Sequence, residues 1–548
     1  MQRPNDQATN PPFGSTALGL TLLTLASAVY VGSLALNHDA ALYLLGARAL
    51  QEGRVLYQTF PDYSFPANMW LAQLSLHLAT WLHVVPALVH TAALFAAECA
   101  AIVLSIRLLD RILPPHALAR AWNAPLLFVV FVVYPSTNAG QRDVLFGVWV
   151  APLMLVALSR TLQRPPSATI ARVALVFAVA GAALKPHFIA VLGLLALCDW
   201  VIRPRPWRDW LVDWLPGGLA ICLYLAIVQI AYPHYFSEVL PTAAHSYGRY
   251  ALGNGVMLSR SIWTVLLGLL AALSLGVVYL QRHRAGLAAP WRLAVGWGLV
   301  ALVLTLLFFL QHQGFGYHRC PASFFFLLTI GLCALFVLEA WLPAPRRRWA
   351  SAVVATCLLA TVAIRVVLPA SALTLRAAWN DPLTVLLRAL PAKTPVLMLE
   401  TGVTATSPLT SYADIRWTGE YGSLVELGAI VQDRDAATAA RRPRDPVLVR
   451  LETDLRHRML GSFTPLQPAI VLVNSATGSR LRWFEGYSKP FKILAFFQED
   501  ASFNAAFSAY QRVGSVGAMD SYTYDVYRRR GAPLAPLPGL GPSGAVQQ

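Results

Sequence analysis

The chain has 548 residues, of which 56% are hydrophobic and only 13% are charged. A soluble protein of this size needs about a quarter of its residues charged, so this composition excludes a soluble protein and indicates an integral membrane protein. The formal net charge of +16 does not indicate nucleic-acid binding, because the basic residues stand in short clusters between hydrophobic runs. The six cysteines lie in or beside those runs without a CxxC pair, which excludes a disulfide framework and a zinc ribbon.

Twelve hydrophobic runs, most of them typical of transmembrane helices, follow one another along the first two thirds of the chain. They are 16–36, 66–84, 87–106, 122–135, 144–159, 171–184, 187–202, 211–232, 260–280, 292–311, 320–341 and 350–369. Five connections carry three arginines each, and the positive-inside rule places these connections in the cytoplasm. The five sets are Arg107, Arg111, Arg120; Arg160, Arg164, Arg172; Arg203, Arg205, Arg208; Arg282, Arg284, Arg292; and Arg346, Arg347, Arg348.

The run 66–84 decides how many times the chain crosses the membrane. If the crossings alternate backward from the last arginine set, the loop near 84–86 lies outside. The loop after the first run must lie outside as well, and both conditions hold only if 66–84 does not cross. Trp70, Leu74 and Trp81 fall on one helical face of that run, whereas Gln73 and His77 are polar, as in a helix that lies at the membrane surface. We therefore predict eleven crossings, with residues 1–15 in the cytoplasm and everything after residue 370 outside.

The first run, 16–36, is compatible with either a cleaved signal peptide or a membrane anchor. A small-residue triplet, Ala26, Ser27 and Ala28, would allow cleavage. Because apolar residues continue to Leu36, we expect an uncleaved anchor. Either outcome leaves the following loop on the outer side.

That first outer loop, 37–86, begins with a lone acid directly after the membrane span. Asp39 stands where a helix N-cap would stand, and Leu42, Leu45 and Ala49 recur at helical spacing before Gly53. Residues 40–52 are therefore predicted to form a short amphipathic helix at the membrane surface. Asp39 is either only a helix cap or a group that takes part in chemistry, and this loop alone does not distinguish the two.

After Pro369 the composition changes to that of a soluble domain. Short apolar segments within 371–530 predict a small outer α/β domain with strands at 395–400, 469–474, 492–497 and 522–527. Residues 531–548, rich in Gly and Pro, predict a disordered tail. The chain has no Walker or dinucleotide glycine motif, so we predict no direct use of a nucleotide.

Three further outer loops carry polar side chains that the predicted topology brings to the side of Asp39. The segments are PSTNAGQRDVLF, LKPHF and HQGFGYHRC, and they contribute Gln141, Arg142, Asp143, Lys185, His187, Gln313, Tyr317, His318 and Arg319. Each residue alone has an ordinary explanation as a helix cap or a lipid anchor. Their gathering on one side predicts a substrate site, because ionisable groups at membrane depth are costly. Glu98, within 87–106, is either part of a structural ion pair or a cavity residue.

Asp39 with the following YLLGARALQEGRVLYQTFPDYSFP resembles the first outer loop of the GT-C glycosyltransferases, in the bacterial branch similar to dolichyl-phosphate-mannose protein mannosyltransferases. The stretches GQRDVLF and QGFGYHRCP also resemble motifs of that branch, and the resemblance covers residues 15–340. It implies a GT-C-like membrane domain, 16–370, and an inverting sugar transfer on the periplasmic face of the bacterial inner membrane. It also implies Asp39 as the catalytic acid or base and Asp143 as a second acid.

The resemblance implies a polyprenyl-phosphate-linked donor, whose anionic leaving group needs cations to meet it. We expect the donor phosphate to be bound by Lys185, Arg142, His187, His318 and Arg319. The substrate cavity is expected to include Tyr43, Tyr57, Asp62, Gln141, Gln313, Tyr317 and Glu98. The acceptor would be an envelope glycan, lipid or protein. No cofactor is predicted, and the loop has HDA where many relatives carry two adjacent acids, so a divalent metal has no support in the sequence.

A rival interpretation of the same residues is a transporter or flippase of a lipid-linked or small polar substrate. Buried Glu98, Lys185 and Asp143 would then line a substrate path. The long first outer loop, the soluble outer domain and the lack of paired hydrophobic halves favour the transferase. A scaffold without catalysis would leave the acids unexplained.

Overall fold

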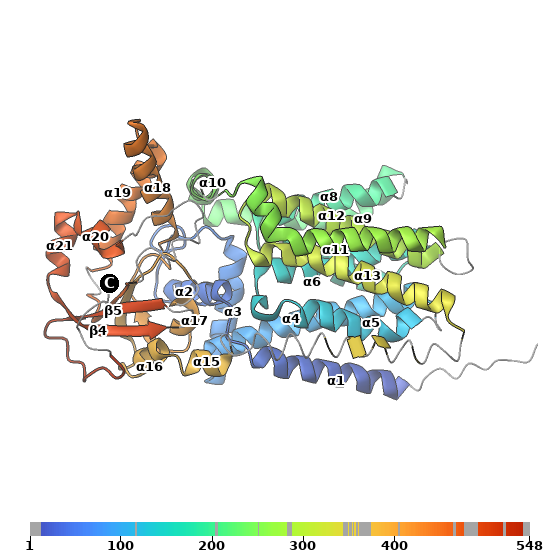
Figure 1. The fold of residues 1–548 in the computed structure, drawn as a ribbon, viewed down its shortest axis with the longest axis horizontal. Helices are drawn as coiled ribbons and strands as arrows, with labels where there is room; N and C mark the ends of the chain where they lie inside the picture. The colour runs from blue at the N-terminus through green and yellow to red at the C-terminus, as the bar shows by residue number, and fades with distance from the viewer. Residues whose placement is uncertain are drawn as a thin grey trace, which may run out of the picture.

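The structure is a computed structural model in which the helices form an elongated bundle with a small sheet domain at one end (Figure 1). It describes residues 13–114, 118–202, 206–249, 251–281, 288–343, 374–403, 406–422, 424–463, 467–475, 492–518 and 522–540, together with a few residues between 349 and 360. The two parts share one buried hydrophobic core that runs from the bundle into the sheet.

The bundle is built from long apolar helices. They are α1 (Phe13–Gly32), α4 (Pro86–Ile112), α5 (Leu118–Phe128, continued by a π turn, η1, Val129–Val133), α6 (Arg142–Thr161), α7 (Ala168–Ala182), α8 (Pro186–Ile202), α9 (Trp207–Ala231), α11 (Asn254–Leu280), α12 (Ala288–Gln311) and α13 (Cys320–Trp341). Six of the described helices are long and apolar enough to cross a membrane, and four shorter helical segments are also apolar. The protein is therefore a multi-pass helical membrane protein. The predicted run 350–369 lies largely outside the described residues.

Packing inside the bundle depends on aromatic side chains. Phe131 of η1 meets Phe324 of α13 edge to face, with ring centroids 5.5 Å apart. Gly147 of α6 lets this ring approach, because a Cβ atom there would lie only 3.0 Å from the Phe324 ring. Leu269 and Leu273 of α11 are instead exposed on the outer surface of the bundle, as expected for side chains in contact with lipid.

Three predicted arginine-rich connections meet at the bundle end away from the sheet. A guanidinium nitrogen of Arg164, Nη1, donates to the carbonyls of Arg111 (3.2 Å) and Ile112 (3.0 Å). Arg160 pairs with Asp213 of α9 at 2.8 Å. The described arginines of these connections therefore share one face of the membrane domain. Arg203, Arg205, Arg282, Arg284 and Arg346 to Arg348 lie outside the described residues.

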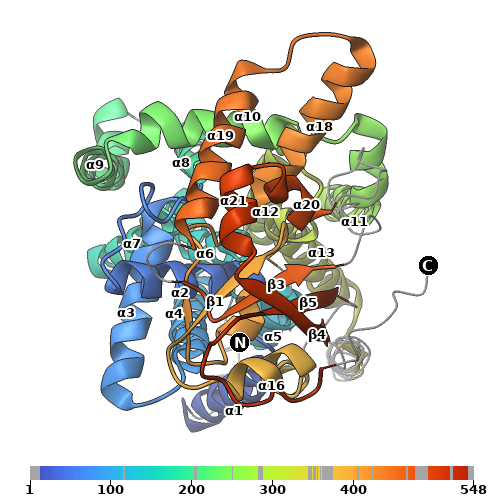
Figure 2. The ribbon, with the colours of Figure 1, turned by 90° about the vertical axis from the view of Figure 1, so that its left-hand side faces the viewer.

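Three helices lie across the bundle axis between the bundle and the sheet: α2 (His38–Gln51), α3 (Pro66–Leu82) and α10 (Leu240–Gly248) (Figures 1 and 2). A second π turn, η3 (Tyr235–Val239), precedes α10. The helix α3 is not among the described helices long and apolar enough to span, and its Leu74 and Trp81 are exposed. The predicted helix in 66–84 is confirmed by α3, and its place at the membrane surface stays a prediction. His83, with φ +54°, ends α3 in the left-handed conformation and turns the chain into α4.

The C-terminal domain is a five-stranded sheet covered by short helices. Its strand order is β2-β1-β3-β5-β4. The strands β2, β1 and β3 are parallel, β5 pairs antiparallel with β3, and β4 pairs antiparallel with β5. The strands are β1 (Thr394–Leu399), β2 (Ile415–Trp417), β3 (Ile470–Asn474), β4 (Tyr510–Ala518) and β5 (Tyr522–Arg529). The helices are α15 (Leu375–Trp379), α16 (Pro382–Arg388), α17 (Thr406–Thr410), α18 (Val425–Ala440), α19 (Pro446–Gly461), α20 (Ile493–Gln498) and α21 (Ala501–Phe507).

Three of the four predicted strands, 395–400, 469–474 and 522–527, are confirmed by β1, β3 and β5. The predicted strand 492–497 is wrong, because this segment forms the helix α20. Its buried residues Ile493, Phe496 and Phe497 stand at the i, i+3, i+4 spacing of a helix rather than in alternation. The strands β2 and β4 were not predicted. Residues 531–540, placed in the predicted tail, form an irregular segment with Ala532 buried, and 541–548 lie outside the described residues.

The first loop and the residue before it hold the sheet domain by hydrogen bonds between side chains and the backbone. Arg54 donates from Nη2 to the carbonyl of Trp417 and from Nη1 to that of Gly419, both at 2.6 Å. The amide of Leu36 donates to the hydroxyl of Tyr412 at 2.8 Å. Since all three contacts join residues far apart in sequence, they fix the sheet domain over the end of the bundle.

A cysteine-labelling experiment tests the orientation of α3. Val84 is exposed after α3, Ser508 is exposed in the sheet domain, and Ser167 is exposed at the arginine-rich end. In a background with Cys222 and Cys357 replaced by serine, we expect Val84→Cys and Ser508→Cys to react with an impermeant maleimide from the same membrane face. Ser167→Cys should react only from the opposite face. Joint reaction of positions 84 and 167 would show that α3 crosses the membrane.

Candidate functional site

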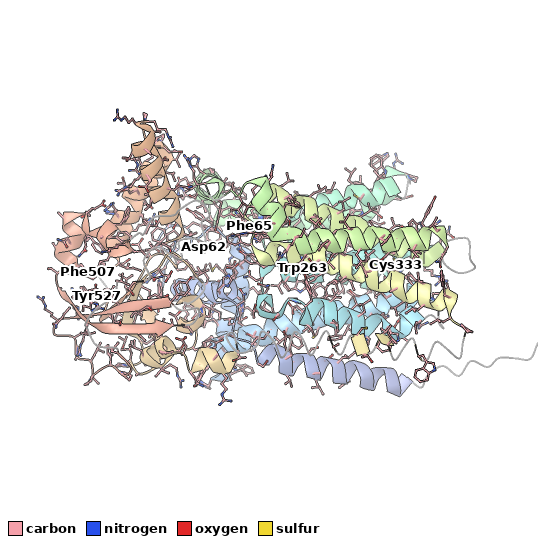
Figure 3. All side chains as sticks on the ribbon, in the orientation of Figure 1. Asp62, Phe65, Trp263, Cys333, Phe507 and Tyr527 are labelled. Carbon is pink, nitrogen blue, oxygen red and sulfur yellow. The ribbon has the colours of Figure 1, made fainter. Side chains whose placement is uncertain are left out.

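A cavity of about 540 Å³ lies where the bundle, the first loop and the sheet domain meet. Figure 3 shows Asp62 at this junction, between the helices and the sheet. Nine of the predicted site residues line the cavity, namely Asp39, Tyr43, Asp62, Arg142, Lys185, His187, Gln313, Tyr317 and His318. Segments that are up to about 280 residues apart in the membrane domain therefore converge on one space, as the loop topology predicted.

Asp39 is not the cap of α2. The side-chain oxygen of Asn37 accepts from the amide of Asp39 at 3.0 Å, so Asn37 is the N-cap and α2 begins at His38. The Asp39 carboxylate is thereby left for the cavity. It lies 3.5 Å from the Arg142 guanidinium and 3.5 Å from the His38 ring, and all three groups line the cavity.

Arg142, the first residue of α6, is held by the first loop. It donates from Nη1 to the Ser64 hydroxyl at 3.0 Å and lies over the Tyr43 ring at 5.3 Å. Its Nε has no hydrogen-bond partner among the described residues. A buried guanidinium nitrogen without a partner is costly, so this atom is available for an anionic or polar ligand.

Lys185 and Asp143 form a buried ion pair at the end of the cavity nearest the membrane helices. The Lys185 ammonium donates to the Asp143 carboxylate at 2.6 Å, and it lies 3.2 Å from Nε2 of His318. Lys185 occupies the turn between α7 and α8, whereas Asp143 stands in the first turn of α6. Asp143 is 1% exposed and does not line the cavity, so its carboxylate acts on the site through Lys185.

Asp62 and Tyr43 form the wall contributed by the first loop. Burial raises the pKa of the Asp62 carboxyl, against the effect of the Ser64 amide, which donates to Oδ1 at 2.5 Å. Burial also raises the pKa of the Tyr43 phenol well above its ordinary value. Tyr43 therefore remains a neutral hydroxyl at physiological pH.

Five predicted residues do not line the cavity. They are Asp143, described above, and Tyr57, Glu98, Gln141 and Arg319. Arg319 donates to the carbonyl of Arg260 on α11, which turns its charge away from the site. Tyr57 donates to the carbonyl of Ser64 at 2.5 Å and packs on Tyr235, so it supports the loop.

Gln141 and Glu98 have other environments. Gln141 is fully buried beside the His38 ring, at 3.3 Å, behind the cavity wall. Glu98 is buried within α4, and its Oε1 has no hydrogen-bond partner among the described residues. Among the described residues, Glu98 has no ion-pair partner and does not line the cavity, so neither of its two explanations is found there.

The sheet domain supplies a wall of the cavity that the sequence did not predict. This wall includes Glu400, Thr401, Gly402, Glu426, Asn474 and Tyr522, and the membrane side adds His38, Tyr63 and Tyr247. One signal was available: Glu400 and Asn474 each end an apolar strand, and polar residues at the carboxyl ends of parallel strands commonly face a site. Glu426 and Tyr247 carry no comparable sequence signal.

The described residues contain no group of three His, Cys, Asp or Glu side chains arranged to hold a metal ion. No protein-family model matches this chain, and no curated protein matches it significantly. The geometry of the cavity is therefore the basis for assigning a function.

The Lys185–Asp143 pair predicts a double-mutant result. Lys185→Met should lower stability by about 3–5 kcal/mol, because it leaves a carboxylate buried without its partner. Lys185→Met combined with Asp143→Leu should recover most of that loss, since it removes both charges. Thermal unfolding of the detergent-purified variants measures this. Two losses that simply add would show that the groups do not interact.

Proposed function

We propose that the protein is an inverting glycosyltransferase that moves a sugar from a polyprenyl-phosphate donor to an envelope glycan, lipid or protein. The observation that supports this most directly is the pairing of Asp39, a cavity carboxylate not used for capping, with Arg142, whose Nε is unpartnered. Asp39 can accept the proton of an acceptor hydroxyl, and Arg142 can meet the negative charge of a departing phosphate.

In the proposed reaction, Asp39 takes the proton of the acceptor hydroxyl. The acceptor oxygen then attacks the anomeric carbon, and the bond from that carbon to the phosphate oxygen breaks. The electron pair leaves with polyprenyl phosphate, whose added negative charge is met by Arg142 and Lys185. His187 and His318 line the same part of the cavity as further polar contacts.

Asp143 has a positioning role in this scheme rather than that of a second acid. Its carboxylate is buried against the Lys185 ammonium at 2.6 Å. Without it, Lys185 would be a lone charge in a low-dielectric site and would lose its proton readily. Burial lowers the pKa of the Lys185 ammonium, and the Asp143 carboxylate opposes that effect while it holds the side chain beside the cavity.

The proposed topology has eleven crossings, with the cavity and the sheet domain on the periplasmic face of a bacterial inner membrane. It is supported by the long and short apolar helices, by the transverse α3 and by the arginine contacts at the opposite end of the bundle. The lipid tail of the donor would lie among the helices, while its phosphate reaches the cavity.

A biochemical assay separates this proposal from a transporter or flippase. We expect purified protein, given a polyprenyl-phosphate-linked sugar and an envelope extract, to release free polyprenyl phosphate, detected by mass spectrometry. A transporter would move the donor across a vesicle membrane without cleaving it. Intact donor after full incubation with a panel of such sugars would contradict the proposal.

A further prediction concerns Asp39. Asp39→Asn should lower turnover by at least about a hundredfold, because a positioned proton acceptor contributes about 10² to 10⁴ in rate. Stability should change little, since Asn37 rather than Asp39 caps α2. Asp414→Asn is the matched control, because this carboxylate is 61% exposed and pairs with Lys393 at the surface, so the variant should retain activity. An Asp39→Asn variant with near wild-type turnover would contradict the assignment of Asp39 as the base.

A further inference from the structure

The sheet has a topological switch point that opens toward the cavity. The chain leaving β1 runs to β2 on one side, whereas the chain leaving β3 runs through α20 and α21 to β4 at the opposite edge. Where the outgoing connections of two adjacent parallel strands diverge, a crevice forms at their carboxyl ends, and ligands bind there. Glu400 follows β1 and Asn474 ends β3, so both stand at this crevice, and both line the cavity.

Glu400 is held in a fixed orientation at the crevice. Its Oε2 accepts from the Asn474 amide at 2.7 Å and from the Tyr524 hydroxyl at 2.6 Å, and its Oε1 accepts from the amide of Gly402 at 3.0 Å. The Thr401 backbone also donates to this carboxylate, so Glu400 acts on a ligand mainly through its fixed position and its charge. Preorganised groups of this kind bind a ligand without paying much ordering entropy.

Glu426 provides a second acceptor with an unused atom. It stands in the first turn of α18, where the helix dipole stabilises a negatively charged side chain. That structural role does not account for its Oε2, which is buried without a hydrogen-bond partner among the described residues, in a side chain only 5% exposed. Burial raises the pKa of Glu426 to about 7. A ligand hydroxyl in the cavity would satisfy this oxygen.

The two halves of the cavity differ in charge. On the membrane side, Arg142 and Lys185 pair with Asp39 and Asp143, and Asp62 is a third acid, whose pKa is raised by burial. The sheet domain contributes Glu400 and Glu426 but no lysine or arginine among the described lining residues. Tyr63, Tyr247 and Tyr522 add flat rings that suit the apolar face of a sugar.

We propose that this crevice, formed by Glu400, Glu426 and Asn474, is the acceptor subsite, and that it takes a hydroxyl-rich sugar unit that carries no negative charge. The proposal rests on the glycosyltransferase function and adds the chemical class of its acceptor. A sugar hydroxyl donates to the Glu426 oxygen that has no partner among the described residues, whereas an acceptor carboxylate or phosphate in the same place is repelled by the two glutamates above about pH 7, where Glu426 is ionised.

Direct binding of two matched probes tests the subsite. We would titrate the purified full chain with methyl glucoside and with the methyl glycoside of glucuronic acid, which differs only by a carboxylate, and follow saturation-transfer NMR. We expect the neutral sugar to bind about tenfold more tightly, the size of one lost charge-assisted hydrogen bond. Equal binding of the two probes, or no binding of the neutral one, would overturn the proposal.

Variants locate the binding within the cavity. Glu426→Gln should reduce the difference in affinity between the two probes, because it removes one repelling charge. Asn474→Ala should weaken binding of the neutral probe, because it removes a hydrogen bond that holds Glu400. Glu499→Gln is the control, since this glutamate is 54% exposed in the same domain and pairs with Arg434 and Arg456 at the surface. An unchanged preference in both folded crevice variants would also overturn the proposal.

The outcome separates this inference from the proposed function. Selective sugar binding without release of polyprenyl phosphate from any donor would contradict the transferase function and still support a sugar-binding crevice. Release of polyprenyl phosphate with equal use of neutral and acidic acceptors would remove only the acceptor preference.

Discussion

The cost of placing charges in a low-dielectric interior governs the arrangement of this protein. Lys185 and Asp143 are both buried at the end of the helix bundle, and each is tolerable only because the other lies 2.6 Å away. The pair joins α6 to the turn between α7 and α8, so it also fixes how three helices meet below the cavity. Arg142, next in sequence to Asp143, is directed to the other side of the same helix end, toward Asp39 and the first loop.

The membrane domain was largely predictable because two strong signals act together. Lipid requires long apolar helices, and arginine clusters distinguish the two ends of those helices. Once the loops were sorted by side, the convergence of Asp39, Arg142, Lys185 and His318 followed without any long-range information. The orientation of individual side chains did not follow, as Arg319 and Tyr57 show: both belong to the correct loops but point away from the cavity.

The sheet domain was less predictable because its segments are short and its helices and strands have similar composition. After Lys492 the run 493–497 is apolar throughout, and it forms a helix that packs Phe496 and Phe497 into the domain core. The contribution of Glu400 and Glu426 to the cavity depends on how the sheet sits on the bundle. That placement is set by contacts such as Arg54 to Trp417, between residues more than 360 positions apart, which no local pattern encodes.

The way in which the sheet covers the bundle limits the length of acceptor that the proposed transferase could hold. The cavity is about 540 Å³, within the range of about 300–1,000 Å³ typical of small-molecule sites, and it has walls from the bundle, the first loop and the sheet. A space of that size takes only a few sugar units. For the glycosyltransferase proposed above, a long acceptor polymer would place its terminus beside Asp39, so addition at chain ends fits this cavity better than branching along an interior stretch.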